Sequence, residues 1–221
     1  MTKNDLIEEL VAEDYLQTPI IVEAFRQIDR ADFVPETAKN IAYANTALPI
    51  GHGQTISQPL TVAFMLERLA PKTGERVLDI GTGSGWQAAL LAYIVSKNDD
   101  GGSGKVITVE RIPELKRFAE ANLKKYGVLE SGVVKTVLGN GHEGYSDEAP
   151  YDRIIAAAAG SEMPKAWKNQ VALGGCIVAP IGQSIYRYER TGEHEFSKER
   201  YFGFSFVPLV ADSERKERQQ R

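Results

Sequence analysis

The strongest constraint on the fold of this chain comes from the sequence VLDIGTGSGWQAA, residues 77–89. Its apolar start predicts a strand over Arg76–Ile80, and its apolar end predicts a helix over Trp86–Ser96. Three glycines at alternate positions lie between them, where the backbone can approach a ligand closely and a helix N-terminus favours an anion. A strand that passes through such a turn into a helix is typical of open α/β sheets, which bind ligands at the carboxyl ends of their strands.

The chain beyond this unit alternates between strand and helix patterns. Further strands are predicted over residues 105–110, 133–138, 153–157 and 176–180, and helices over 113–126 and 164–171. Such alternation predicts an α/β fold with a mostly parallel, doubly wound sheet and right-handed crossovers. Two more strands, 186–190 and 200–207, flank the turn residues Thr191-Gly192-Glu193 and are predicted to be antiparallel.

Helices precede the sheet. Apolar residues at helical spacing predict a helix from Leu6 to Tyr15, and Thr18 is the expected N-cap of a second helix that starts with proline. The connection from Arg30 to Ser57 is expected to be a loop, and loops this long inside compact domains are often functional. Ser57 is the expected N-cap of a third helix, which ends before Pro71.

The length of 221 residues suits one large α/β domain. Within residues 1–221 we expect a helical, substrate-side region over 1–73 and a cofactor-binding core over 74–182. C-terminal strands are expected over 183–211, and a polar tail over 212–221.

Composition excludes several classes of protein. The net charge of −4 and the pI of about 5.5 give no general attraction to nucleic acid, so we expect no nucleic-acid partner. Cys176 is the single cysteine, which suits a reducing, cytoplasmic compartment. The N-terminus lacks the apolar core of a signal peptide, no apolar run is long enough for a membrane span, and few metal-ligating residues are present. We therefore expect a cytoplasmic monomer without a metal ion.

The glycine pattern restricts the ligand of the turn. The dinucleotide fingerprint G-x-G-x-x-G does not match, because Trp86 stands where its third glycine belongs, and the phosphate-binding pattern G-x-x-x-x-G-K-[ST] is absent. The remaining pattern places Asp79 at a strand end before three glycines. S-adenosyl-L-methionine suits it, because Asp79 can receive the ammonium group, directly or through water, while backbone N–H groups receive the carboxylate.

The next two strand ends carry further candidate ligand contacts. Glu110 closes the strand 105–110, where a carboxylate can accept hydrogen bonds from ribose hydroxyls. Asn140 and Gly141 follow the strand 133–138, where an adenine edge would lie, and the amide of Asn140 offers a donor and an acceptor. Taken alone, Glu110 is also compatible with a surface glutamate, and Gly-Asn-Gly with a simple turn.

From Leu6 to about Val210 the chain resembles the protein-L-isoaspartate O-methyltransferases. The most specific stretch is ALPIGHGQTISQP, residues 47–59, and further matches are DFVP (32–35), GNG (139–141), EAPYD (148–152), APIG (179–182) and FVPL (206–209). The resemblance implies a Rossmann-like class I methyltransferase fold. It also implies methyl transfer from S-adenosyl-L-methionine, which leaves S-adenosyl-L-homocysteine, to isoaspartyl residues of damaged proteins and peptides, and thus their repair.

The resemblance also implies the residues of the site. Ser57 receives an active-site role, and Thr55 to Ser57 line the methyl-transfer cavity. The full set of expected cofactor-binding residues is Thr55, Ile56, Asp79, Gly81, Gly83, Ser84, Gly85, Glu110, Arg111, Asn140 and Gly141.

Two departures from the family pattern affect the site. The family carries Gly-Asp-Gly where this chain has Asn140 between glycines, and Asn140 keeps an acceptor oxygen for the adenine amine. The family tends to have Ala-Ala-Pro after the fourth strand, where this chain has the longer loop 157–164. Because that loop borders the substrate side, we expect it to affect which peptides the chain prefers.

Three alternatives remain on the same scaffold. A nucleic-acid methyltransferase is disfavoured because residues 157–160 lack an Asn-Pro-Pro-Tyr-like motif and the chain is acidic. A catalytically weak or inactive module that binds damaged peptides is compatible with Asn140 and the altered loop. A dehydrogenase is the least favoured, because of Trp86.

Overall fold

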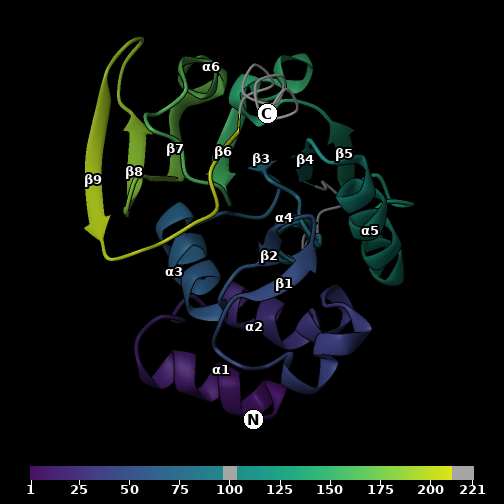
Figure 1. Cartoon of the computed structure of the whole chain (residues 1–221). Helices are drawn as coiled ribbons and strands as arrows, with labels where there is room; N and C mark the ends of the chain where they lie inside the picture. The colour runs from purple at the N-terminus through teal and green to yellow at the C-terminus, as the bar shows by residue number, and fades with distance from the viewer. Residues whose placement is uncertain (97–103, 211–221) are drawn as a thin grey trace, which may run out of the picture.

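The computed structural model describes residues 1–96 and 104–210, and these residues form a seven-stranded sheet with helices on both faces (Figure 1). The strand order is β5-β4-β3-β6-β7-β8-β9. The strands are β3 (Arg76–Ile80), β4 (Lys105–Glu110), β5 (Val134–Leu138), β6 (Tyr151–Ala156), β7 (Val171–Ile181), β8 (Ser184–Arg190) and β9 (Phe196–Phe202). The first five in spatial order are parallel, and β8 and β9 add to β7 as antiparallel strands, as the sequence predicts.

Helices and a small hairpin complete the described chain. The helices are α1 (Lys3–Ala12), α2 (Pro19–Gln27), α3 (Pro59–Leu69), α4 (Trp86–Ser96), α5 (Pro113–Leu123) and α6 (Lys165–Gln170). The hairpin is formed by β1 (Leu48–Gly51) and β2 (Gln54–Ile56). Figure 1 shows α1 and α2 at the end of the molecule that holds the N-terminus, with the hairpin and α3 between them and the sheet. Among the described helices, none combines the length and apolarity that a membrane span requires.

Alternate residues of each central strand enter two different cores. On one face of the sheet, strand residues such as Val77 and Val106 pack with apolar residues of α1 to α5. On the other face, their neighbours Leu78 and Ile107 pack with Trp167 of α6. Because side chains alternate along a strand and both faces are covered, the central strands are apolar at nearly every position.

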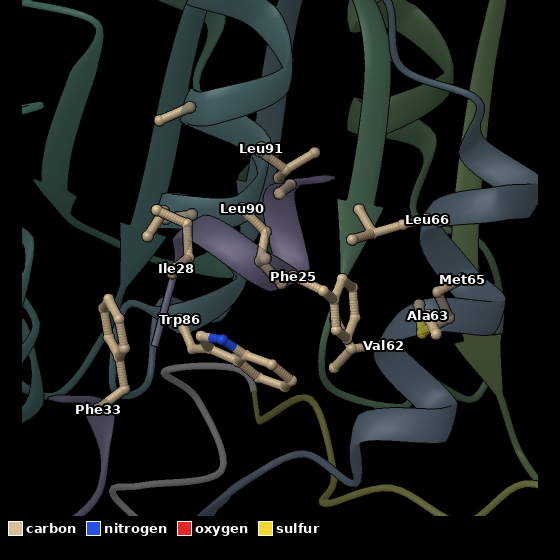
Figure 2. Close-up of a cluster of buried hydrophobic side chains, with 14 of the residues drawn as sticks. Phe25, Ile28, Phe33, Val62, Ala63, Met65, Leu66, Trp86, Leu90 and Leu91 are labelled. Atoms are coloured by element: carbon tan, nitrogen blue, oxygen red, sulfur yellow. The ribbon is translucent and has the colours of Figure 1, made fainter. Parts of the chain in front are cut away.

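The N-terminal helices dock on α4 through a cluster of aromatic and aliphatic side chains. Figure 2 shows Phe25 of α2 and Val62 of α3 next to each other beside the Trp86 ring. The ring centroids of Phe25 and Trp86 lie 5.5 Å apart in an edge-to-face arrangement, which adds to the energy of burial. Since Trp86 is the first residue of α4, this cluster holds the N-terminal helices against the end of the glycine turn.

Several predicted boundaries need correction. The first helix ends at Ala12, because the chain turns at Asp14 with a φ of +61°. The expected loop from Arg30 to Ser57 holds the β1–β2 hairpin and two short 3-10 helices, Arg30–Phe33 and Glu36–Ile41. The last strand covers Phe196–Phe202 rather than 200–207, because Gly203 bends the chain with a φ of +103°. The loop and tail predicted at residues 97–103 and 211–221 lie outside the described residues.

Candidate active site

The glycine turn joins β3 to α4 at the carboxyl edge of the sheet. Gly83 has a φ of +54°, which few residues other than glycine adopt readily. Gly85 has a φ of +90°, and a Cβ atom there would lie 3.2 Å from Leu123 and 3.3 Å from Ala119 of α5. The two glycines therefore have different roles. Gly83 allows the backbone conformation of the turn, and Gly85 allows α5 to pack closely against it.

Glu110 ends β4 and organises the neighbouring backbone. It is only 6% exposed. One carboxylate oxygen accepts a hydrogen bond from Gly83 N at 2.9 Å, and the other accepts from Arg111 N and Ile112 N, both at 2.9 Å. The carboxylate that the sequence predicts at this strand end is therefore buried, and it is hydrogen-bonded directly to the glycine turn.

Asp79 lies deeper than the sequence suggests. It is fully buried, and its two oxygens accept hydrogen bonds of 2.7 Å from Gln87 Nε2 and Thr108 Oγ1. Burial raises the pKa of Asp79 to about 6, although both hydrogen bonds favour the ionised form. Direct contact with a ligand's ammonium group does not fit, because Asp79 lines neither cavity beside the turn, whereas its partner Gln87 does line one.

Asn140 and Gly141 follow β5, as expected, but they take different places. The side chain of Asn140 folds back on its own loop, accepting a hydrogen bond from His142 N and donating one to Glu143 Oε1, both at 3.1 Å. Gly141 lines a cavity together with Glu110, and its carbonyl accepts a hydrogen bond of 2.8 Å from Trp167 Nε1. Both polar atoms of the Asn140 side chain are thus engaged within its own loop, and its contact with an adenine edge stays a prediction.

Three adjoining cavities run along this edge. Cavity A, with a volume of about 320 Å³, is lined by Ala47, Thr55, Ser57, Gln58, Thr61, Ala157, Ser205, Phe206 and Val207. Cavity B shares Thr55, Ser57 and Ala157 with it, and is also lined by Ile56, Val62, Gly81, Thr82, Gly83, Ser84, Trp86 and Gln87. Cavity C shares Gly81 with cavity B and is also lined by Gln54, Ile80, Val109, Glu110, Arg111, Ile112, Gly141, Ala158, Pro208 and Leu209. Nine expected site residues therefore line these cavities, while Asp79, Gly85 and Asn140 do not.

Ser57 lies where cavities A and B meet, but it does not cap α3. The helix starts at Pro59 with Gln58 as its N-cap residue, and the N–H of Leu60 donates to the side chain of Asn45 at 3.0 Å. Within the described part of the chain, the Ser57 hydroxyl makes no hydrogen bond. The cap prediction was therefore wrong, and the hydroxyl is available to a ligand.

The match to known proteins covers almost the whole chain. The family model described as protein-L-isoaspartate(D-aspartate) O-methyltransferase matches residues 1–214. The chain belongs to this family.

Individual relatives agree. The protein-L-isoaspartate O-methyltransferase of Methanopyrus kandleri is 42% identical over 211 residues, which are 94% of this chain and 90% of that protein. That of Staphylothermus marinus is 45% identical over 196 residues, 87% and 86% of the two chains. A Plasmodium falciparum structure described by the same family name, in complex with S-adenosyl-L-homocysteine, matches with a TM-score of 0.85 at 26% identity, covering 95% of this chain and 99% of that one.

A buried arginine that supports the candidate site could not be found from the sequence. Arg30 is 2% exposed and donates to the carbonyl of Ala42, to Thr46 O at 2.9 Å and to Ser57 O at 3.1 Å. Its guanidinium group also lies 5.3 Å from the centre of the Trp86 ring. Burial lowers the pKa of Arg30 to about 10, so the group remains cationic at neutral pH. Arg30 ties both ends of the segment 42–57, which carries the hairpin, to the wall of cavity B.

The second missed element is the segment 203–209 after β9, here called the strap. Its residue Val207 accepts a hydrogen bond of 2.8 Å from Ala159 N, and Leu209 N donates to Ala159 O at 2.8 Å. Through these bonds the strap lies beside the loop 157–164 and lines both cavity A and cavity C. The sequence match at 206–209 signalled this segment, but no local pattern predicts its place over the site.

Proposed function

We propose that cavities A, B and C together form the active site in which this chain methylates isoaspartyl residues. The chain is a protein-L-isoaspartate O-methyltransferase by family, and it transfers a methyl group from S-adenosyl-L-methionine to the free α-carboxylate of such residues in damaged proteins and peptides. One observation carries the assignment of the site: the unpartnered Ser57 hydroxyl lies between a roomy outer cavity and the glycine turn.

The groups around cavities B and C suit S-adenosyl-L-methionine. Glu110 is buried, yet it lines cavity C with a carboxylate able to accept further hydrogen bonds, as ribose hydroxyls require. Gly81, Gly83 and Ser84 line cavity B just before the N-terminus of α4, a position that suits a carboxylate. Gln87, held by Asp79, stands where Asp79 itself was expected, and Arg111 and Gly141 line the far end. When bound, the cofactor supplies an electrophilic methyl group on a sulfonium centre.

The chain's own residues orient the nucleophile and exclude water. The substrate α-carboxylate has a pKa of about 4 and is already ionised at neutral pH, so no general base is needed. We assign the Ser57 hydroxyl to orient that carboxylate, with Thr55 beside it on the wall of cavity A. Apolar residues Ile56, Val62 and Trp86 line cavity B and limit access of water. The methyl ester formed favours ring closure to a succinimide, whose hydrolysis can return normal aspartate.

Paired peptides test this function directly. The purified chain is incubated with tritiated S-adenosyl-L-methionine and an isoaspartyl peptide or its aspartyl twin. We expect base-labile label on the isoaspartyl peptide and little on the twin. Equal labelling of both, or label that resists mild base, contradicts carboxylate-specific transfer. The alternative, an inactive module, would bind damaged peptides without methylating them. Calorimetric titration shows whether the chain binds the cofactor, as an active enzyme must.

The finer features of the partners remain part of the proposal. We expect a cytoplasmic monomer that acts on isoaspartyl proteins and not on nucleic acid. The acidic charge of −4 supports the second expectation, and the single cysteine, Cys176, supports a reducing compartment. Light scattering coupled to gel filtration tests the monomer, and a mass near 24.4 kDa is the expected result.

A further inference from the structure

The outer part of the sheet has two faces of different character. On one face of β8 and β9, Tyr186 pairs with Arg200 and Tyr188 pairs with Lys198. Lys168 of α6 joins them, because its Nζ atom lies 5.5 Å from the centre of the Tyr188 ring. These five residues are here called the cation–aromatic face.

The cations of this face rest on rings rather than on carboxylates. Lys198 Nζ lies 4.7 Å from the centre of the Tyr186 ring and 5.6 Å from that of Tyr188. The guanidinium group of Arg200 lies 5.9 Å from Tyr186 and 5.8 Å from Phe202, a ring that is 72% exposed. Within the described residues, Lys168, Lys198 and Arg200 form no salt bridge. Rings position these cations without neutralising them.

The opposite face of the same two strands is neutralised. Arg187 forms ion pairs of 2.8 Å with Glu189 and 2.9 Å with Glu199, and the Tyr201 hydroxyl donates to Glu199. Arg68 of α3 stacks on Tyr201 with 5.1 Å between its guanidinium and the ring centre. The acidic side chains of β8 and β9 thus gather on the face covered by α3, which leaves positive charge on the other face of a chain that is acidic as a whole.

The cation–aromatic face is connected to the candidate active site. Arg200 Nε donates to Ser184 Oγ at 3.0 Å, and Ser184 opens β8 at the turn from β7. At that turn Gly182 N donates to Gly160 O at 3.1 Å, within the loop beside cavity A. The strap also leaves the end of β9 (Figure 1), and its residues 205–207 line cavity A. A polypeptide segment that leaves cavity A across the β7–β8 turn, where Ser184 and Arg200 lie, would therefore reach this face.

We propose that the cation–aromatic face docks an acidic segment of the substrate protein that flanks the isoaspartyl residue. This inference rests on the proposed function and adds a determinant of substrate choice to it. Charge complementarity favours carboxylates over other ligands. A single-stranded nucleic acid is disfavoured, because base stacking needs open ring faces and here cations lie over the rings of Tyr186 and Tyr188.

The test compares two isoaspartyl peptides that share one core sequence, one with a flank of Asp and Glu and one with a flank of Asn and Gln. The variant is the double substitution Lys198→Gln with Arg200→Gln. The control variant, Lys39→Gln with Arg117→Gln, removes the same charge at partly exposed surface sites on other elements. Steady-state methylation is measured at low salt and again at 0.5 M NaCl, a condition of about 4 Å screening length.

We expect the docking variant to raise KM for the acid-flanked peptide about fivefold at low salt, as two exposed charge contacts allow. Its kcat is unchanged, the neutral-flank peptide is unaffected, and high salt removes the difference. The control variant should behave like the wild type.

The proposal is overturned if the wild type shows the same KM for both peptides, or if the docking variant changes KM for both peptides alike. Loss of oligonucleotide binding in the docking variant, with peptide KM unchanged, assigns the face to nucleic acid instead. A wild type that methylates neither peptide refutes the proposed function itself.

Discussion

Replacing Arg30 by methionine tests how the active-site segment is held. Methionine keeps an unbranched apolar chain of similar reach beside Trp86 but cannot donate a hydrogen bond. The change leaves the carbonyls of Ala42, Thr46 and Ser57 without their shared partner. Because these carbonyls belong to the two ends of the segment 42–57, we expect the hairpin and Ser57 to shift together.

The size of the effect follows from the burial of each bond. The bond to Ala42 is buried, and leaving its carbonyl unsatisfied costs about 1–3 kcal/mol. The bonds to Thr46 and Ser57 are part-buried, so water replaces them at a lower cost. We expect a total loss of about 3 kcal/mol, which lowers Tm by roughly 6–12 °C for a domain of this size. A shift of about 1 Å at Ser57 is expected to lower kcat/KM up to about 100-fold.

Calorimetry and steady-state methylation of an isoaspartyl peptide measure these effects. Tyr126→Phe is the matched control, since it removes hydrogen bonds with Asp29 N and Asp32 Oδ2 next to Arg30 but none made directly by the segment 42–57. We expect that control to lower Tm without lowering kcat/KM per folded molecule. Arg30→Lys keeps the charge but has fewer directed donors. Its Tm and its kcat/KM are expected to lie between those of the wild type and those of Arg30→Met. If Arg30→Met keeps the wild-type Tm and kcat/KM, Arg30 does not hold the site.

Three further substitutions give distinct outcomes. Ser57→Ala is expected to keep the wild-type Tm, since Gln58 occupies the N-cap position, but to lower kcat about 10- to 100-fold; an unchanged kcat moves the orienting role to Thr55 or backbone. Gly83→Val forces a branched residue to a φ of +54° and is expected to abolish cofactor binding in calorimetry, while near-native binding places the pocket elsewhere. Asp79→Asn addresses pH dependence. The pKa of Asp79 is about 6 in the folded chain and about 4 when unfolded, so its contribution to stability falls as pH rises through that interval. The free energy of unfolding in urea is therefore expected to change in favour of the Asn variant, relative to the wild type, when the pH is raised from 4 to 7. The reverse trend contradicts the assignment.

The residues that sequence analysis placed well are those whose surroundings are local. The bounds of β3 and α4 follow from an apolar run on each side of the glycines, and the structure confirms both. Ser57 was misplaced as a cap because two local signals compete. Serine favours the N-cap, but Pro59 fixes the first helical turn two residues later. In the structure Pro59, and not the serine, determines where the helix starts.

Other features depend on contacts between distant segments and could not be predicted. The burial of Asp79 depends on Gln87 from α4 and Thr108 from β4, so its depth is not visible in the pattern around residue 79. Arg30 lies in an unremarkable loop sequence, and its carbonyl partners follow 12 to 27 residues later. The strap has no helical or strand periodicity, and its place is set by pairing with Ala159.

The strap also makes the substrate cavity depend on residues that come after the whole sheet in the chain. Residues 203–209 follow every strand of the sheet in chain order, yet they supply a wall to cavities A and C. A chain cut off after β9 keeps every strand of the sheet and the glycine turn, but it lacks one wall of cavities A and C. Loss of these few residues is therefore expected to leave a folded scaffold without a closed substrate site.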